Sequence, residues 1–230
     1  DLNFPTTGAN NLYFDLDISG STQALSWAPV SHGGITATMT DSTSTSVRVT
    51  LTGPVATESQ WTSNNPGRID RLSLPQVFEL VGRDSSGNAV VKYGFELKQW
   101  FVNRGNYEST LSSIESWCNS FGYRVPKVKE LTNAVCQEWN AGPYCRGAVG
   151  ATPSSPDMSF RRHIGAGFFT EWGIMRYPGA NFKGVYGNRT QYLTSDKSSY
   201  DNLIFVISGY NGGVSYRYTN EKTYGLCVYP

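Results

Sequence analysis

The sequence has few charged side chains and almost no excess of either sign. Among its 230 residues, 16% are Asp, Glu, Lys or Arg, and the formal net charge is +1. A surface without a strong field of one sign does not attract nucleic acid or an anionic membrane. We therefore expect neither of them as a partner.

Long apolar runs are also missing. The longest aliphatic run is LIFVI at 203–207, whereas a membrane-spanning helix needs ~20 apolar residues. We expect no direct insertion of this chain into a membrane. Because the sequence starts at Asp1 without a leader, we expect a processed or excised part of a longer protein that is anchored elsewhere.

Signals for catalysis are scarce. The chain contains two histidines, His32 and His163, and no G-x-S-x-G, H-E-x-x-H or phosphate-binding loop. Glu171, within the aromatic stretch FFTEW, is better explained as a buried carboxylate held by hydrogen bonds than as a general acid. We expect no enzymatic activity and no cofactor.

The four cysteines favour disulfides over a metal site. Cys118, Cys136, Cys145 and Cys227 show no C-x-x-C spacing, which a zinc site would usually have, so an oxidising compartment is expected. Four cysteines allow three pairings, and spacing alone does not choose among them. The short interval from Cys136 to Cys145, with its Gly-Pro turn, favours a local loop and leaves Cys118 to pair with Cys227.

The first hundred residues show the pattern of short strands. In SVRVTLT, Val47, Val49 and Leu51 alternate with polar residues, as in a strand with one buried face. The segment DSSGN at 84–88 is typical of a hairpin loop. The spacing of such runs predicts an all-β immunoglobulin-like sandwich over residues 1–98, with a closed barrel as the alternative.

The apolar period changes after residue 100. Residues 111–121 carry one apolar stripe at helical spacing, with Ser112 and Glu115 as a capping box and Gly122 as the stop. Pro126 predicts the start of a second helix.

The remainder of the second half is irregular before strands return. Residues 141–202 show little periodicity and read mostly as loop, and strands follow in LIFVISG, GVSYRYTN and TYGLCVYP. One strand, two helices, a long irregular stretch and a terminal sheet predict an α+β domain over residues 99–230. With a disulfide from the first helix to the last strand, this layout resembles the C-type lectin-like fold.

Five segments carry a resemblance to a known family: FPTTG, FELKQWFVN, WCNSFGYRVPKVKELT, GAGFFTEWG and YGLCVYP. In this order the chain resembles, over nearly its whole length, the C-terminal tip of the intimin and invasin adhesins, and is most similar to the invasin D type. The resemblance implies an outer-membrane protein of enteric bacteria, in which an upstream β-barrel exports immunoglobulin-like domains capped by a lectin-like domain. The Cys136 and Cys145 pair and the insertion at 147–167 depart from the family pattern.

The resemblance implies a role in cell adhesion at the bacterial surface. The expected partner is a host protein, either a cell receptor such as an integrin or an immunoglobulin. The calcium-binding triplets of sugar-binding lectins, E-P-N or Q-P-D with W-N-D, are absent, and Asp157, Asp196 and Asp201 are dispersed, so we expect no metal site. The alternative is a lectin that binds host glycans by stacking sugars on tyrosine.

Tyrosines alternate with Gly, Asn, Ser and isolated Arg between residues 177 and 218. Tyrosine offers a large contact area at low rotamer cost, so this composition is typical of binding loops. The competing interpretation is that these rings pack beneath their own loops. The predicted contact residues are Tyr186, Arg189, Tyr192 and Tyr200, with Arg161 and Arg162 as a basic rim.

Overall fold

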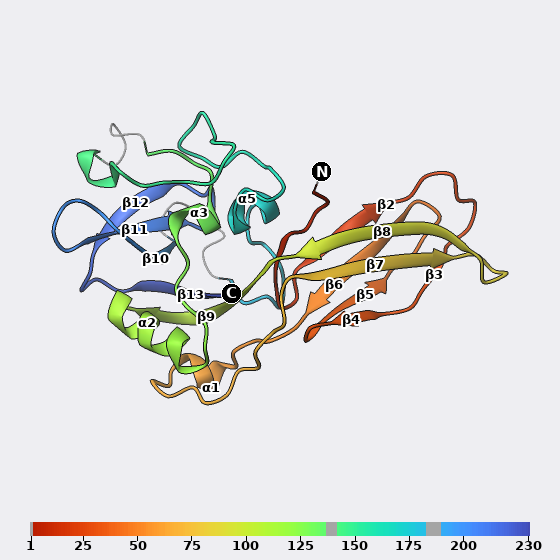
Figure 1. Ribbon diagram of the computed structural model, residues 1–230, viewed down its shortest axis with the longest axis horizontal. Helices are drawn as coiled ribbons and strands as arrows, with labels where there is room; N and C mark the ends of the chain where they lie inside the picture. The colour runs from red at the N-terminus through yellow and green to blue at the C-terminus, as the bar shows by residue number, and fades with distance from the viewer. Residues whose placement is uncertain (1, 137–141, 183–189) are drawn as a thin grey trace.

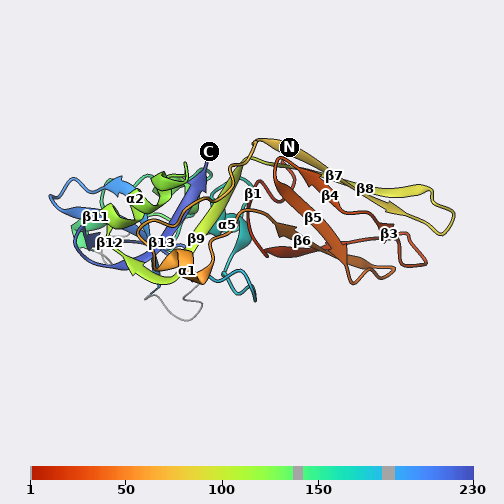
Figure 2. The same cartoon turned by 90° about the horizontal axis from the view of Figure 1, so that it is seen from below.

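The computed structural model describes residues 2–136, 142–182 and 190–230. Three β-sheets account for most of the regular structure, so the prediction of a β-rich chain is confirmed. The molecule is elongated, with two sheets at one end and the third at the other (Figures 1 and 2). No helix in the described residues is long and apolar enough to cross a membrane.

Two antiparallel sheets face each other in the first half of the chain. The first has the order β2 (Tyr13–Asp17), β6 (Ser46–Thr52), β5 (Ile35–Thr40), β4 (Val30–His32), and the second has the order β3 (Ser26–Trp27), β7 (Gln76–Arg83), β8 (Ala89–Leu97). Val47, Val49 and Leu51 are fully buried, which confirms the predicted alternation. The predicted hairpin is also present, because Asp84 N donates to Asn88 O at 3.0 Å.

The third sheet contains the strands of the second half and one strand from the N-terminus. Its order is β1 (Thr7–Ala9), β9 (Gln99–Ser109), β13 (Thr223–Tyr229), β10 (Gln191–Lys197), β11 (Leu203–Ser208), β12 (Val214–Tyr218). The short helices are α1 (Glu58–Trp61), α2 (Leu111–Ser120), α3 (Val128–Leu131), the 3₁₀ helix η1 (Gly142–Cys145) and α5 (Phe168–Trp172).

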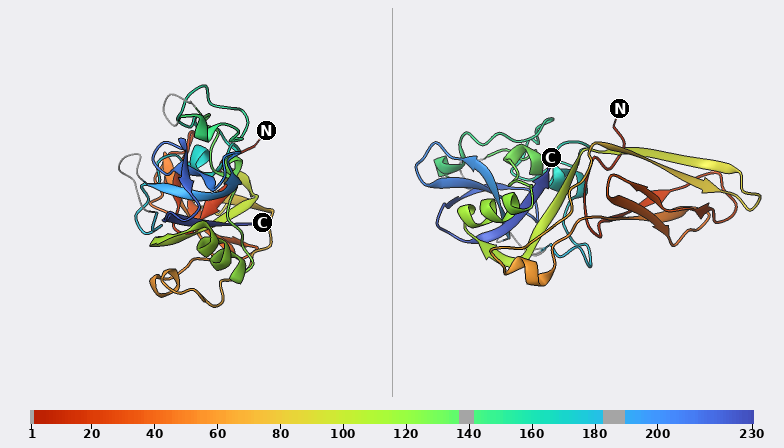
Figure 3. Two further views of the ribbon diagram at one scale, coloured as in Figure 1. Left: turned by 90° about the vertical axis from the view of Figure 1, so that its left-hand side faces the viewer. Right: turned by 60° about the horizontal axis from the view of Figure 1, so that its bottom comes forward.

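Two elements from the first half pack with this third sheet. Strand β1 pairs in parallel with β9, and a Cβ at Gly8 would lie 2.9 Å from the ring of Trp100, so a glycine is required at this close approach. Helix α1 lies beside α2 (Figures 1 and 3), and Trp117 Nε1 donates to Gln60 O at 3.0 Å. The division into residues 1–98 and 99–230 stays a prediction.

Helix α2 confirms the predicted apolar stripe and is tied to the last strand. Its Cys118 forms a disulfide with Cys227 of β13, with Cα atoms 5.5 Å apart. The predicted cap was wrong: Thr110 Oγ1, not Ser112, accepts the hydrogen bond from Ser113 N, so the helix starts two residues earlier than a cap at 112 would allow. Gly122 ends it with φ +83°.

The second predicted helix is much shorter than expected. Helix α3 spans four residues and is preceded by Lys127 rather than opened by Pro126. The chain leaves the helix because Thr132 is extended and the Asn133 amide donates to Pro153 O and Arg161 O at 2.9 and 3.0 Å. Buried side-chain bonds to the 150–161 segment thus replace the helical ones.

Strand β10 lies in the region that the sequence indicated to be loop. It is a central strand of the third sheet, between β13 and β11, and Tyr192, Leu193 and Thr194 are buried in succession. Both faces are covered, so the expected alternation is missing. The buried Thr194 hydroxyl donates to Phe205 O at 2.7 Å.

Candidate binding surface

The structure separates the predicted contact tyrosines. Tyr186 and the neighbouring Arg189 lie outside the described residues. Tyr192 is 1% exposed, with its ring centroid 5.4 Å from that of Phe169, so its prediction as an exposed contact residue was wrong. Tyr200, which follows β10, is 41% exposed. A ring in a central strand packs in the core, whereas a ring in the adjoining loop reaches the surface.

Tyr200 belongs to a cluster of surface tyrosines. Its ring meets that of Tyr144 edge-on at 5.1 Å, and the Tyr144 ring lies 4.9 Å from that of Tyr216. Tyr218 follows on the same side of β12, two residues further on. Tyr144 and Tyr218 are 39% and 54% exposed. We call Tyr144, Tyr200, Tyr216 and Tyr218 the aromatic patch.

The second disulfide holds one member of the patch in place. Cys136 and Cys145 are bonded with Cα atoms 5.7 Å apart, which is the pairing that the sequence favours. Cys145 is fully buried, next to the exposed Tyr144 in η1, and η1 lies against β12. Ser198 Oγ also donates to Tyr144 O at 3.1 Å, so the segment before Tyr200 is fixed to η1.

The aromatic patch lies on the part of the third sheet that is far from the first two sheets. Its edge strand β12 is at the end of the molecule opposite β3, β7 and β8 in two views (Figures 1 and 2). Tyr144, Tyr216 and Tyr218 were not among the predicted contact residues. A tyrosine inside a short disulfide loop and two tyrosines alternating along an edge strand are the signals that could have found them.

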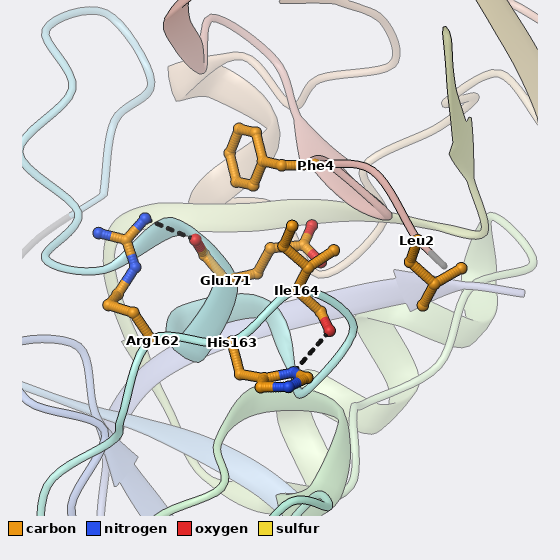
Figure 4. Close-up of a pocket in the computed structure, with 6 residues that line it drawn as sticks. All are labelled: Leu2, Phe4, Arg162, His163, Ile164 and Glu171. Atoms are coloured by element: carbon orange, nitrogen blue, oxygen red, sulfur yellow. Dashed lines mark hydrogen bonds between the residues drawn. The ribbon is translucent and has the colours of Figure 1, made fainter.

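Arg161 and Arg162 are bonded to groups outside the aromatic patch. Arg161 Nη2 is 3.0 Å from Asp157 Oδ2 in an exposed ion pair, which contributes little to stability. Arg162 Nη2 donates to Glu171 O at 2.8 Å (Figure 4). In the part of the chain that the structure describes, neither arginine bonds to a tyrosine of the aromatic patch. The role of these two arginines as a basic rim stays a prediction.

Glu171 is a structural carboxylate, as predicted. It is 2% exposed and accepts five hydrogen bonds, from the backbone N and Oγ1 of both Thr6 and Thr7 and from Gly165 N, at 2.6–3.0 Å. The neighbouring Trp172 Nε1 donates to Thr7 O at 3.0 Å. These bonds join the N-terminal segment to α5.

Two of the dispersed acidic side chains already have protein partners. Asp157 pairs with Arg161, and Asp196 Oδ2 accepts a hydrogen bond from Val128 N at 2.8 Å. Within residues 2–136, 142–182 and 190–230, no group of three or more His, Cys, Asp or Glu side chains could hold a metal ion.

Comparison with known proteins gives one informative likeness. No protein-family model matches the chain. No curated protein matches it. A solved structure, the crystal structure of invasin, described as a bacterial integrin-binding protein, is similar over 98% of this chain with a TM-score of 0.60 and 14% sequence identity. The chain has the fold of that part of invasin and spans 35% of the invasin chain.

Proposed function

We propose that this chain is the host-binding end of a bacterial cell-surface adhesin and that the aromatic patch contacts a host protein. The observation that carries the proposal is the patch itself: Tyr144, Tyr200 and Tyr218 are each more than a third exposed, although they come from three separate segments. Clustered surface aromatics favour a protein interface, because such rings supply most of the binding free energy at many interfaces.

The fold likeness supports the wider architecture of the proposal. We infer an immunoglobulin-like domain over residues 1–98 that carries a C-type lectin-like domain over residues 99–230, in the manner of the invasin D type. Two disulfides fit an extracellular location. In this proposal an upstream β-barrel in the outer membrane anchors the chain, and the partner is a receptor such as an integrin or an immunoglobulin.

The chemistry of the patch suits a protein ligand. A tyrosine ring buries a large area while its hydroxyl can still bond, and few rotatable angles are lost on binding. The Cys136–Cys145 disulfide lowers the cost further because the backbone at Tyr144 is ordered before the ligand arrives. Binding of this kind requires no calcium and no enzymatic step.

A binding panel tests the proposal. The purified chain is measured by biolayer interferometry against host surface receptors that include integrin ectodomains, against immunoglobulins and against glycans. A protein ligand that Tyr200→Ser weakens and Val77→Ser leaves unchanged is expected, since Val77 is 64% exposed on β7, away from the patch. If binding is undiminished after all four tyrosines are replaced, the aromatic patch is not the contact surface. If the chain binds glycans and no protein, the lectin alternative is favoured.

Calcium independence has its own test. A bound ion stabilises the folded state by a free energy that rises with the logarithm of its concentration over its Kd. The melting temperature of the chain is expected to be the same in millimolar calcium and in EDTA. A higher melting temperature in calcium than in EDTA would contradict this part of the proposal without affecting the proposed role of the aromatic patch.

A further inference from the structure

Two neighbouring hollows meet where the N-terminal segment crosses between the first two sheets and α5. The larger, about 690 Å³, is lined by Leu2, Phe4, Arg162, His163, Ile164 and Glu171 (Figure 4). The second, about 520 Å³, shares Phe4 and Arg162 and adds residues such as Tyr13, Tyr93, Ile174 and Tyr177. We call these two hollows the junction groove; it does not include the aromatic patch.

The walls of the larger hollow are mainly apolar. Leu2 and Ile164 are 46% and 36% exposed. The Phe4 ring packs edge-on against that of Trp172, with the ring centroids 4.7 Å apart. Exposed apolar groups on a concave surface favour an apolar ligand group, because each Å² of apolar surface that binding removes from water stabilises the complex.

Arg162 places a fixed cation in this groove. Its Nη2 is bonded to Glu171 O, and its guanidinium lies over Gly173, where a Cβ would come within 2.8 Å of Nη1. Neither Nε nor Nη1 bonds to any of the described residues. The guanidinium is therefore oriented by α5 and keeps donors for a ligand, which is the arrangement that recognises a carboxylate.

The acidic groups of the groove already accept hydrogen bonds from protein donors. Asp15 is held by Arg48, with Nε–Oδ1 and Nη2–Oδ2 distances of 2.9 and 3.1 Å, and the Glu171 carboxylate already accepts five hydrogen bonds. His163 Nδ1 lies 2.8 Å from Ile164 O.

We propose that the junction groove binds an extended segment of a protein partner, with an acidic side chain on Arg162 and an adjacent apolar side chain against Leu2, Phe4 and Ile164. The positive charge of Arg162 and its unused Nε and Nη1 donors argue for the acidic residue, and the apolar walls argue for its neighbour. An acidic sugar fits less well, because its hydroxyls need polar partners that Leu2, Phe4 and Ile164 do not offer. This site is independent of the proposed function of the aromatic patch.

The test uses the ¹⁵N-labelled chain and two blocked peptides, Ac-Gly-Leu-Asp-Gly-NH2 and its Leu-Asn analogue. The acidic peptide is expected to shift the NMR resonances of the backbone amides near Phe4 and Arg162 until the site is saturated. The analogue is expected to bind about tenfold more weakly, because it lacks the charge-assisted bond. Arg162→Gln should abolish this difference. Arg161→Gln is the matched control, because that side chain pairs with Asp157, and it should preserve the difference.

Three results would overturn the proposal: no saturable shift, equal affinity for both peptides, or an unchanged difference in Arg162→Gln. If Arg162→Gln unfolds, two measurements replace it. In the unaltered chain, added salt should weaken the binding of the acidic peptide more than that of its analogue. The Ile164→Ser variant should bind both peptides more weakly, and by the same factor. N-acetylneuraminic acid is tested in the same way. If it shifts the same amide resonances and neither peptide binds, the groove binds an acidic sugar and the proposal of a peptide ligand is wrong.

Discussion

Thr6 and Glu171, which are 165 residues apart, are joined by two hydrogen bonds: Thr6 N to Oε1 at 2.6 Å and Thr6 Oγ1 to Oε2 at 2.7 Å. The N-terminal strand is thus bound to α5 through a buried carboxylate whose partners in the described residues are N–H and O–H donors. A carboxylate that accepts several such bonds can remain charged when buried.

Glu171→Gln should destabilise the chain by about 3 kcal/mol. In one orientation the NH2 group of the glutamine amide would face the backbone N–H groups of Thr6 and Thr7, and in the other it would face that of Gly165. All three N–H groups now donate to the carboxylate. Urea unfolding measures the loss. Glu79→Gln, at an exposed ion pair with Lys92, is the control and should change the free energy of unfolding by less than ~0.5 kcal/mol.

The two disulfides should differ in their contribution to stability. They close intervals of 109 and 9 residues, so chain entropy predicts about 4–5 kcal/mol for Cys118–Cys227 and about 2–3 kcal/mol for Cys136–Cys145. Paired Cys→Ser variants compared by urea unfolding test this order. The Cys136–Cys145 variant should also lose binding at the aromatic patch, and equal losses of stability in both variants would contradict the loop-length argument.

Local patterns were sufficient to predict several elements. The alternation of Val47, Val49 and Leu51 identified β6, because one face of that strand is buried and the other is not. The apolar stripe over 111–121 identified α2 for the corresponding reason. In both cases one element faces one core, so its periodicity is visible in the sequence.

Features that depend on distant residues were not predictable in this way. Strand β1 is three residues long and finds its partner β9 beyond the whole first half. Tyr192 and Tyr200 have similar sequence surroundings, yet one lies in a central strand and the other in the loop after it. The contact between Tyr144 and Tyr200 depends on packing between separate segments, so their proximity is not a local property of the sequence even where each residue carries a local signal.

Replacing surface and core tyrosines should separate binding from stability. Tyr200→Ala should leave the melting temperature within about 2 °C and reduce ligand binding. Tyr192→Ala should destabilise the chain by about 3–5 kcal/mol, because it leaves a cavity against Phe169 and Phe182. Thermal unfolding followed by circular dichroism measures both. A large stability loss in Tyr200→Ala would show that its ring has a structural role and would weaken the proposed patch.

Glu130 should make folding sensitive to acid. Burial raises the pKa of this carboxyl, but hydrogen bonds from Arg124, the Lys127 backbone and Gln99 outweigh burial, and its pKa is lowered from 4.5. A group whose pKa is lower in the folded state stabilises the fold above its unfolded pKa and loses that contribution as pH falls through the folded value.

The free energy of unfolding in urea should therefore fall between pH 5 and pH 3 (about one unit either side of the unfolded pKa), and Glu130→Gln should reduce that fall. The neutral variant cannot gain a proton, so it should be less stable than the unaltered chain at pH 7 and closer to it at pH 3. Glu79→Gln, whose carboxylate is exposed, should follow the unaltered chain at both values. A Glu130→Gln profile parallel to that of the unaltered chain would mean that other carboxylates govern the acid sensitivity.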